Sequence, residues 1–323
     1  MSTVMVTGAT GLVGANVCAL AIEQGHDVVA LVRSASPELE ALGVRTHRGD
    51  VASAHDVSAA ARGADVIIHS AAILGSVYSD PDPTANEAVN VGGMTNVLDA
   101  AEASGARVVA ISTISILESG SKFTERTPIA KPAAKDSLYV STKRAAHHEL
   151  QRRAALGLHA QSIFPAAIYG PSPLAKRAVD VTGQNAKIIR AIRGDMARYP
   201  AIVVGWVFAT DVASRALAAA RVGSPGATYL AMGDQRDTAN FPEFLSIACE
   251  LAGVPHRVLA APPIADDPTV LEEFGPFAYE ADVVKPRPIF DDSETRRILG
   301  LSSVSVAEGL PQTVAWLKAV GEI

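Results

Sequence analysis

The sequence feature that most constrains the fold is a glycine-rich segment near the N-terminus. Residues 7–14 read Thr-Gly-Ala-Thr-Gly-Leu-Val-Gly, after an apolar run at residues 4–6 and before an Ala-rich stretch at residues 12–21. A strand, a glycine turn and a helix in this order can hold a pyrophosphate against free N–H groups at the helix start. We assign Gly8 to the tight turn, Gly11 to the close approach of phosphates, and Gly14 to close helix packing. The GxxGxxG spacing departs from the general GxGxxG fingerprint, so an ordinary glycine-rich turn is the competing explanation.

Short β-branched runs recur along the first half of the chain, at residues 28–32, 44–48, 66–69 and 108–111. Helical patterns lie between them, notably at residues 88–104, which precede a glycine. This alternation predicts an α/β fold, a doubly wound parallel sheet (Rossmann fold), with ligands at the carboxyl ends of the strands. We expect a smaller, mostly C-terminal substrate-binding region. The predicted dinucleotide-binding domain covers residues 1–170, with 205–230 returning to it, and residues 171–204 and 231–323 bind substrate.

Composition narrows the classes of protein that the chain can belong to. No uninterrupted apolar run has membrane-spanning length, and the first strand begins near residue 3, so we expect neither a membrane partner nor a signal peptide. Cys18 and Cys249 lie far apart, which supports neither a disulfide framework nor a zinc site, and His147 and His148 have no further metal ligand at suitable spacing. A net charge of −6 without a long basic run argues against nucleic acid as a ligand. We expect a soluble, cytoplasmic protein without a metal.

The end of the second strand bears on the choice between NAD and NADP. An acidic residue about 20 positions after the glycine loop would bind the ribose hydroxyls of NAD, but this chain has Arg33 and Ser34 there. A guanidinium matches the geometry and charge of a 2′-phosphate. We therefore predict NADP as the cofactor, with NAD as the alternative and a solvated arginine as the simpler explanation.

A second motif points to catalysis. Tyr139 and Lys143 are four residues apart, on one face if the segment is helical. A nearby positive charge would lower the pKa of the phenol and let it act as a general acid or base. The fifth strand runs into Ser112, Thr113 and Ser115, whose hydroxyls could donate to a substrate carbonyl. The Tyr-x-x-x-Lys pair alone is weak evidence for catalysis. A glycine loop earlier in the chain strengthens that evidence.

These segments make the chain resemble the extended short-chain dehydrogenase/reductase family, in its epimerase- and dihydroflavonol-reductase-like group. Further matches lie at residues 49–51, 69–72, 90–93, 165–171, 207–213 and 292–317. The resemblance implies that Tyr139 is the general acid/base, that Lys143 is its partner and a ribose contact, and that Thr113 polarises the substrate oxygen. Ser112 and Ser115 are alternatives to Thr113. The family habit also implies a homodimer.

The resemblance also implies a cofactor site. Asp50 and Val51 are the implied adenine contacts, Ala71 and Ala72 line the cofactor between its halves, and Ile168 meets the nicotinamide amide through its backbone. Asn90 matches a position near the active site, although a hydrogen bond at a helix start explains it equally well. The predicted cofactor site consists of Gly8, Thr10, Gly11, Leu12, Val13, Gly14, Arg33, Ser34, Asp50, Val51, Ser70, Ala71, Ala72, Ser112, Tyr139, Lys143, Pro165 and Ile168.

The chain departs from the family pattern in informative places. Phe164 stands before Pro165 where the family often has arginine, and Ile114 and Ser115 replace the Asp and Glu of sugar-nucleotide dehydratases, which disfavours dehydration. Residues 171–204 carry a basic excess that could bind an anionic substrate, although a solvated helix face also explains it. We interpret Asp211 as a helix N-cap.

Three functions fit these observations. The first is an oxidoreductase that transfers a hydride between NADP(H) and a carbonyl or secondary alcohol of a small organic substrate, with Tyr139 assisted by Lys143 and Thr113. The second is an NAD-dependent nucleotide-sugar epimerase, which the basic excess supports, but no uracil- or diphosphate-binding signature is present. The third is a non-catalytic dinucleotide sensor, which would need neither Tyr139 nor Lys143. We predict the first.

Overall fold

A seven-stranded sheet, parallel throughout, organises the structure, a computed structural model that describes all residues except 75–81, 135, 181–182, 234–238, 276–277 and 280–286. The strand order is β12-β7-β5-β4-β1-β2-β3, so the order reverses beside β1 and leaves the ligand crevice of a doubly wound sheet there. The predicted α/β fold class is confirmed. The strands are β1 (Thr3–Thr7), β2 (Asp27–Val32), β3 (Arg45–Arg48), β4 (Val66–His69), β5 (Arg107–Ile111), β7 (Ala160–Pro165) and β12 (Thr228–Ala231).

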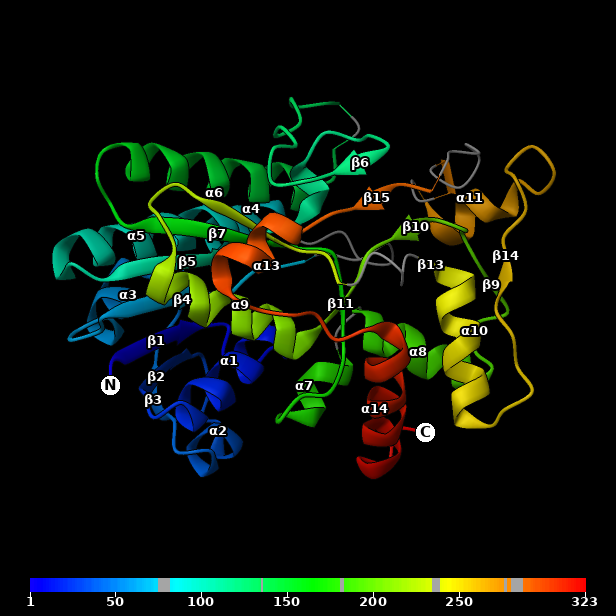
Figure 1. Ribbon diagram of the computed structural model, residues 1–323, viewed down its shortest axis with the longest axis horizontal. Coiled ribbons are helices and arrows are strands. Elements are labelled where there is room, and N and C mark those ends of the chain that lie inside the picture. The colour runs from blue at the N-terminus through cyan, green and yellow to red at the C-terminus, as the bar shows by residue number, and fades with distance from the viewer. Residues whose placement is uncertain (75–81, 135, 181–182, 234–238, 276–277, 280–286) are drawn as a thin grey trace.

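Helices cover both faces of this sheet, as the β-branched, almost fully apolar strands require. Val4 and Val6 of β1 pack toward α1 and α9, whereas Met5 between them packs toward α3, α5 and α6 (Figure 1). Among the described residues, no helix is both long enough and apolar enough to cross a membrane. The covering helices are α1 (Leu12–Glu23), α2 (Pro37–Ala41), α3 (Ala54–Ala60), α4 (Pro83–Glu87), α5 (Gly93–Ser104), α6 (Leu138–Ala155) and α9 (Ala209–Val222).

The helix predicted at residues 88–104 differs from expectation at its start. It begins with α4 and passes through a π-helical turn, Ala88–Gly92, before α5. The predicted end is confirmed, because Gly105 adopts a left-handed φ of 75° that terminates the helix. The π-helical turn could not be predicted from apolar spacing, which continues through it.

Most of the remaining elements pack around aromatic side chains, whereas α13 packs on α9 and β12 of the main sheet. Tyr169 contacts Trp206 and Phe244 edge-on, and Trp206 stacks on Phe244 with ring centroids 3.6 Å apart. The helices here are α7 (Ala175–Asp180), α8 (Gln184–Arg193), α10 (Phe241–Ala252), α11 (Thr269–Phe274), α13 (Ser293–Leu299) and α14 (Val306–Ala319). The short strands pair as β8 (Ala167–Tyr169) with β11 (Trp206–Phe208), β10 (Val203–Val204) with β13 (Ala239–Asn240), β9 (Arg198–Tyr199) with β14 (Leu259–Ala260), and β6 (Lys122–Phe123) with β15 (Ile289–Phe290).

Residues 205–230 return to the main sheet only in part. The strand β11 pairs with β8 and not with the main sheet, while α9 covers the sheet and β12 supplies its edge strand. The division of the chain into dinucleotide-binding and substrate-binding domains stays a prediction.

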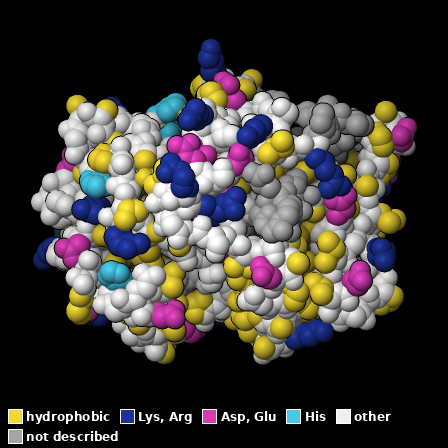
Figure 2. Space-filling model, in the orientation of Figure 1, with side chains coloured by type: hydrophobic (Ala, Val, Ile, Leu, Met, Phe, Trp, Pro, Cys, Tyr) yellow, Lys and Arg dark blue, Asp and Glu magenta, His cyan; other side chains and the backbone are white. Residues whose placement is uncertain are grey.

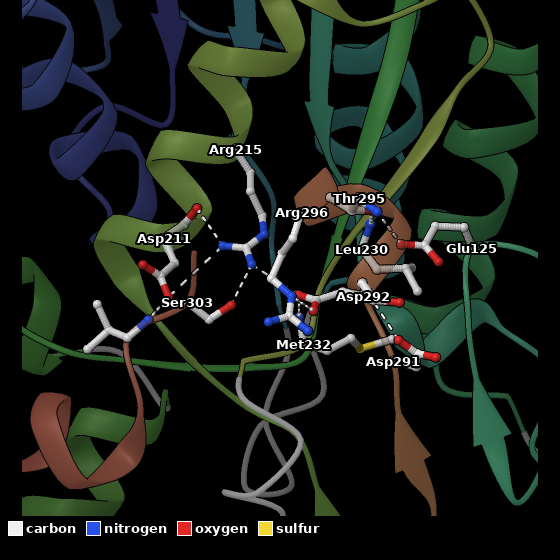
Figure 3. Close-up of polar contacts among 12 residues, drawn as sticks. Glu125, Asp211, Arg215, Leu230, Met232, Asp291, Asp292, Thr295, Arg296 and Ser303 are labelled. Atoms are coloured by element: carbon white, nitrogen blue, oxygen red, sulfur yellow. Dashed lines mark hydrogen bonds and ion pairs between the residues drawn. The ribbon is translucent and has the colours of Figure 1, made fainter. Parts of the chain in front are cut away.

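A buried ion-pair network joins α9 to the C-terminal segment (Figure 3). The guanidinium of Arg215, fully buried, donates to Asp292 Oδ2 over 3.0 Å and to Ser303 Oγ over 2.7 Å. Arg296 Nε lies 2.9 Å from the other oxygen of Asp292, close enough for an ion pair but not aligned for a hydrogen bond. Because a buried charge is costly without partners, this network fixes α13 and the following loop against α9.

The same C-terminal segment covers the edge of the main sheet. The outward N–H of Leu230 in β12 donates to Thr295 Oγ1 over 2.9 Å, and that of Met232 donates to Asp292 Oδ2 over 3.1 Å. Edge strands with free N–H groups invite pairing with other chains. Side chains of α13 therefore satisfy the edge that the sheet leaves open (Figure 3).

The interpretation of Asp211 as a helix N-cap is wrong. Phe208 occupies the N-cap position of α9, and Asp211 lies inside the first turn. Its Oδ2 accepts a hydrogen bond of 2.8 Å from the N–H of Val304, in the segment before α14. The carboxylate thus serves a distant part of the chain and not its own helix, a contact that local sequence does not encode.

Burial gives Asp211 a testable effect on stability, because it raises the carboxyl pKa from 3.8 to about 6. Between these pH values the folded state holds a proton that the unfolded state has released, so this group's contribution to stability falls as the pH rises. Asp211→Asn removes that titration. We expect the unfolding free energy of the wild type, relative to the variant, to fall by up to ~3 kcal/mol between pH 4 and 7 in urea melts.

The matched control for this experiment is Asp27→Asn, which removes an exposed carboxyl at the start of β2. An equal pH-dependent change in both variants would assign the effect to overall charge and would remove the role given to the buried site.

Candidate active site

The glycine loop lies at the carboxyl end of β1, where the strand order reverses. Gly8 has a φ of 69°, and a Cβ there would lie 2.6 Å from the backbone nitrogen of Ala71, so only glycine fits. A Cβ at Gly14 would overlap the carbonyl group of Gly8, so this glycine packs α1 against the loop itself and not against a strand. Gly11 at the N-cap of α1 has no side chain to cover the first N–H groups of the helix. This geometry fits a bound phosphate.

The residues predicted to bind the adenosine half lie at the same edge of the sheet. Leu31 of β2 is in register with Thr7, so the exposed Arg33 follows directly beside the loop. Arg33 makes no ion pair with any residue in the described ranges. The Asp50 carboxylate accepts a hydrogen bond from the N–H of Ala52 over 2.9 Å, which orients it after β3. The exposed Ser34 follows Arg33, and the buried Val51 follows Asp50.

A buried hydrogen-bond pair fixes the segment after β4. Thr7 Oγ1 lies 2.8 Å from His69 Nδ1 and also accepts a hydrogen bond from the N–H of Ala71. Burial, reinforced by the charge of Lys143, lowers the pKa of His69 to about 3, so the ring is neutral at pH 7. The Thr7 hydroxyl therefore bonds the His69 ring and the Ala71 backbone at the same time. These hydrogen bonds hold the backbone after β4, where the predicted site residues at positions 70–72 lie.

Thr113 and Tyr139 meet at the carboxyl end of β5. Burial raises the pKa of Tyr139 to about 12, and a hydrogen bond with the Thr113 side chain opposes this rise. The hydroxyls of Thr113 and Ser115 lie 3.1 Å apart. Of the three hydroxyls considered from sequence, that of Ser112 is buried without a hydrogen-bond partner among the described residues. The structure therefore brings Thr113 to the phenol and leaves the Ser112 hydroxyl buried without a partner in the part of the chain that the structure describes.

Lys143 behaves differently from the expectation that it would lower the pKa of Tyr139. Its Nζ donates a hydrogen bond of 2.7 Å to the carbonyl of Ile111, and burial lowers its pKa to about 8. The dominant influence on the phenol is its own burial, which outweighs any nearby cation. At neutral pH, Tyr139 is a protonated phenol beside a charged ammonium group.

A buried amide network that the sequence did not indicate positions α6. The side chain of Asn90 accepts from the N–H of Ile73 over 2.8 Å and donates to its carbonyl over 3.0 Å. The same Nδ2 lies 2.9 Å from Asn86 Oδ1 and 3.0 Å from the Thr142 hydroxyl oxygen, which in turn lies 3.0 Å from Asn86 Oδ1 and 2.7 Å from the carbonyl of Leu138. All three polar side chains are at most 5% exposed. Asn90 is therefore near the active site, inside the π-helical turn, and makes no helix-start hydrogen bond.

This network links the segment after β4 to the helix that carries Tyr139 and Lys143. π-Helical turns inside α-helices often occur at functional sites. The only sequence signal for Asn86 is its spacing of four from Asn90, which places two amides on one face of a helical pattern. Thr142 gave no signal, because it reads as an ordinary residue within the Tyr-x-x-x-Lys motif.

Thr142→Val tests the positioning role of this network, since valine has the shape of threonine without the hydroxyl. Two buried amides would lose a partner, so we expect a loss of ~1–3 kcal/mol in unfolding free energy, measured by urea melts, and a reduced kcat. Ser141→Ala is the matched control, because Ser141 is exposed on the same helical turn and should change stability by less than ~0.5 kcal/mol. Equal effects of the two variants would contradict the assignment.

Three of the basic residues after position 171 lie in different surroundings. Arg193 pairs with Glu322 over 3.2 Å near the C-terminus, while Arg198 pairs with Glu273 over 2.9 Å in a different part of the chain. Lys187 is half-buried with its Nζ 6.0 Å from the centre of the Phe241 ring, and burial lowers its pKa to about 8. On the face drawn in Figure 2, Lys and Arg side chains are dispersed among other types.

The other predicted site residues lie near the same strand ends. Pro165 ends β7 and is in register with Ala231, and the half-buried Ile168 lies in β8. His147 is buried against the ring of Phe164, at a centroid distance of 5.0 Å. Within the described residues, no group of three or more potential ligands could hold a metal ion.

Comparison with known proteins identifies the family. The family model described as the NAD dependent epimerase/dehydratase family matches residues 4–231. The chain belongs to this family. The resemblance to extended short-chain dehydrogenases/reductases is thereby confirmed, and the chain is an enzyme of the nicotinamide-dependent oxidoreductase type.

Individual relatives differ in how much of the chain they match. The Sterol demethylase protein B of Methylococcus capsulatus is 28% identical over 340 residues, covering 99% of this chain and 100% of that protein. The 3 beta-hydroxysteroid dehydrogenase/Delta 5-->4-isomerase of Mycobacterium tuberculosis is 33% identical over 184 residues, covering 53% of this chain and 48% of that protein, so the match spans about half of that relative. The solved structure of MoeE5 in complex with UDP-glucose and NAD has the same fold, with a TM-score of 0.77 and 22% identity over 98% and 99% of the two chains.

Proposed function

We propose that this protein transfers a hydride between NADP(H) and the carbonyl or secondary alcohol of a small organic substrate. The observation that carries the proposal is the arrangement of three groups: Tyr139 lies one helical turn before the buried Lys143 on α6, Lys143 Nζ bonds the carbonyl at the end of β5, and the Thr113 side chain lies near the phenol. These groups lie at the carboxyl edge of the sheet, as does the glycine loop. A phenol and a hydroxyl that converge in this way can hold a single substrate oxygen between them.

The residues present fit a nicotinamide dinucleotide. The loop around Gly8 leaves no room for a side chain, the helix start at Gly11 is uncovered, and the Ser112 hydroxyl is buried without a protein partner in the described ranges. When bound, the nicotinamide supplies or accepts the hydride. A buried hydroxyl without a partner is costly, and a ligand that reaches it would remove that cost.

The protein side of the reaction is proton transfer and charge stabilisation. With a pKa of about 12, the Tyr139 phenol is protonated at neutral pH and can donate a proton to the substrate oxygen in the reductive direction. Thr113 hydrogen-bonds the same oxygen. Lys143, with a pKa of about 8, is cationic at pH 7 and stabilises the phenolate that forms.

Two observations favour oxidoreduction over the other chemistries of the family. Ile114 and Ser115 follow Thr113, so the strand end offers no carboxylate for elimination of water. The relative named as a hydroxysteroid dehydrogenase supports redox chemistry at a secondary alcohol. The alternative, an NAD-dependent nucleotide-sugar epimerase, would need cations for two phosphates, and Arg193 and Arg198 are engaged in separate ion pairs.

Tyr139→Phe tests the acid/base assignment. Removal of the hydroxyl should lower kcat at least ~100-fold, because general acid catalysis typically contributes 10²–10⁴-fold, while the dissociation constant of the dinucleotide changes little. Turnover is measured by NADPH absorbance with a panel of ketones, aldehydes and nucleotide sugars. Tyr229→Phe is the matched control, because the Tyr229 hydroxyl accepts a hydrogen bond from the N–H of Ser224, away from the candidate site. Retained turnover in the Tyr139 variant would mean that another group is the acid.

Arg33→Ala tests the preference for NADP. Loss of a charge-assisted contact to the 2′-phosphate should weaken NADPH binding by roughly 10- to 100-fold and leave NADH binding unchanged. Fluorescence titration with both cofactors measures the effect. Arg62→Ala, which removes an exposed arginine just before the start of β4, is the control. An equal loss for both cofactors would remove the argument for NADP.

A further inference from the structure

Residues 165–171 connect the two ends of the candidate site, and we call them the spacer segment. Their first residue, Pro165, ends β7, the strand next to β5 in the main sheet. Ser112, just after β5, donates its N–H to the carbonyl of Ile163 in β7 over 2.8 Å. Because the two strands are parallel, Thr113 and Pro165 leave the sheet beside each other. The spacer segment thus begins beside the proposed catalytic groups.

The far end of the spacer segment is fixed to the helix that follows the glycine loop. Asn16, one turn into α1, donates from its side chain to the carbonyl of Pro171 over 3.0 Å and to that of Leu12 over 2.8 Å. The Asn16 side chain is buried. Because Leu12 opens α1 directly after Gly11, these contacts tie the end of the segment to the helix start that fits a phosphate.

A second buried amide holds the spacer segment one residue earlier. Asn185 of α8, which is fully buried, accepts a hydrogen bond of 3.1 Å from the N–H of Gly170 and donates one of 2.8 Å to its carbonyl. Gly170 has a φ of 131°, and a Cβ there would lie 3.0 Å from Cε2 of Phe208. Buried backbone groups need partners, and the Asn185 amide supplies them for both polar groups of this glycine.

The two asparagines therefore fix the path of the spacer segment. Under the proposed function, a dinucleotide has its phosphates at the glycine loop and its reacting carbon beside Thr113 and Tyr139. The spacer segment runs between the same two places, from the end of β7 to α1. A displacement of about 1 Å at the reacting carbon can cost roughly 100-fold in rate, so the position of each end of the segment matters for turnover.

We infer that Asn16 and Asn185 are positioning residues, which set the distance between the phosphate-binding helix and the strand ends where the nicotinamide reacts. This inference rests on the proposed function and adds two residues that act through backbone contacts. It also gives α8, which lies in the predicted substrate-binding region, a role in the cofactor site. A purely structural role would predict a loss of stability without a selective effect on the nicotinamide.

Comparison of NADH with ADP-ribose isolates this role, because the two ligands share the adenosine half, both phosphates and the second ribose. They differ only in the dihydronicotinamide ring, so the ratio of their dissociation constants measures what the ring adds, whether the protein prefers NAD or NADP. We expect Asn16→Ala and Asn185→Ala to lower this ratio about 3- to 10-fold, roughly the effect of one hydrogen bond. The affinity for ADP-ribose should change by less than about twofold in calorimetric titrations.

Gln151→Ala is the matched control. Gln151 of α6 also donates from a side-chain amide to a glycine carbonyl, that of Gly226, over 3.0 Å. Gly226 lies just before β12, at the opposite edge of the sheet from the candidate site, so this variant should keep the wild-type ratio. If Asn185→Ala does not fold, Asn16→Ala still decides the test, because alanine is the strongest helix former and Asn16 lies inside α1. Thermal melts check that each variant is folded.

Turnover gives a second readout. With any carbonyl compound that the wild type reduces, kcat should fall about 10- to 100-fold in both variants, while KM for the carbonyl changes less than about threefold, because Thr113 and Tyr139 stay in place. A ratio unchanged in both variants, or an equal loss of NADH and ADP-ribose affinity, would overturn the positioning role and leave hydride transfer standing. A lowered ratio in a protein that reduces no carbonyl compound would overturn the proposed function and support the positioning role.

Discussion

The hydrogen bond between Thr7 and His69 is the contact on which the site depends. It joins β1 to β4 at the point where the strand order reverses, and Thr7 also accepts from the N–H of Ala71. Gly8 can approach Ala71 as closely as it does because the two strand ends are held in this register. A charged imidazole would be poorly tolerated in this buried position beside Lys143. The glycine loop and the segment after β4 are therefore held together by side-chain hydrogen bonds and by a close backbone approach.

The same segment is tied to the proposed catalytic helix through Asn90. Its amide bonds the backbone of Ile73 on one side and the hydroxyl of Thr142 on the other, between Tyr139 and Lys143 in α6. Two buried hydrogen-bond networks, one around Thr7 and one around Asn90, thus connect the glycine loop to the helix that carries Tyr139. Effective proton and hydride transfer needs reacting groups held to within a fraction of an ångström, and this continuity of buried hydrogen bonds supplies such a constraint.

The sequence sufficed for features that repeat locally and failed where distant residues meet. The strand at residues 66–69, the helix end at Gly105 and the parallel sheet follow from periodicity and glycine chemistry, and the structure confirms them. The π-helical turn and the role of Asp211 were missed, because each depends on a partner far along the chain. The pKa of Tyr139 was expected to fall and instead rises, since burial cannot be judged from the spacing of two residues.

The C-terminal segment connects α9 to the edge of the main sheet. Asp292 accepts from the N–H of Met232, and Met232 belongs to a buried cluster that includes Phe164 and Phe290. Arg215, from the helix that covers the opposite face of the sheet, holds the same carboxylate. The edge of the main sheet is therefore held by an ion pair between residues 77 positions apart. Because Arg215 and Asp292 are both fully buried, removal of either partner would leave an uncompensated charge and weaken the attachment of α13 to α9 and to the edge of the sheet.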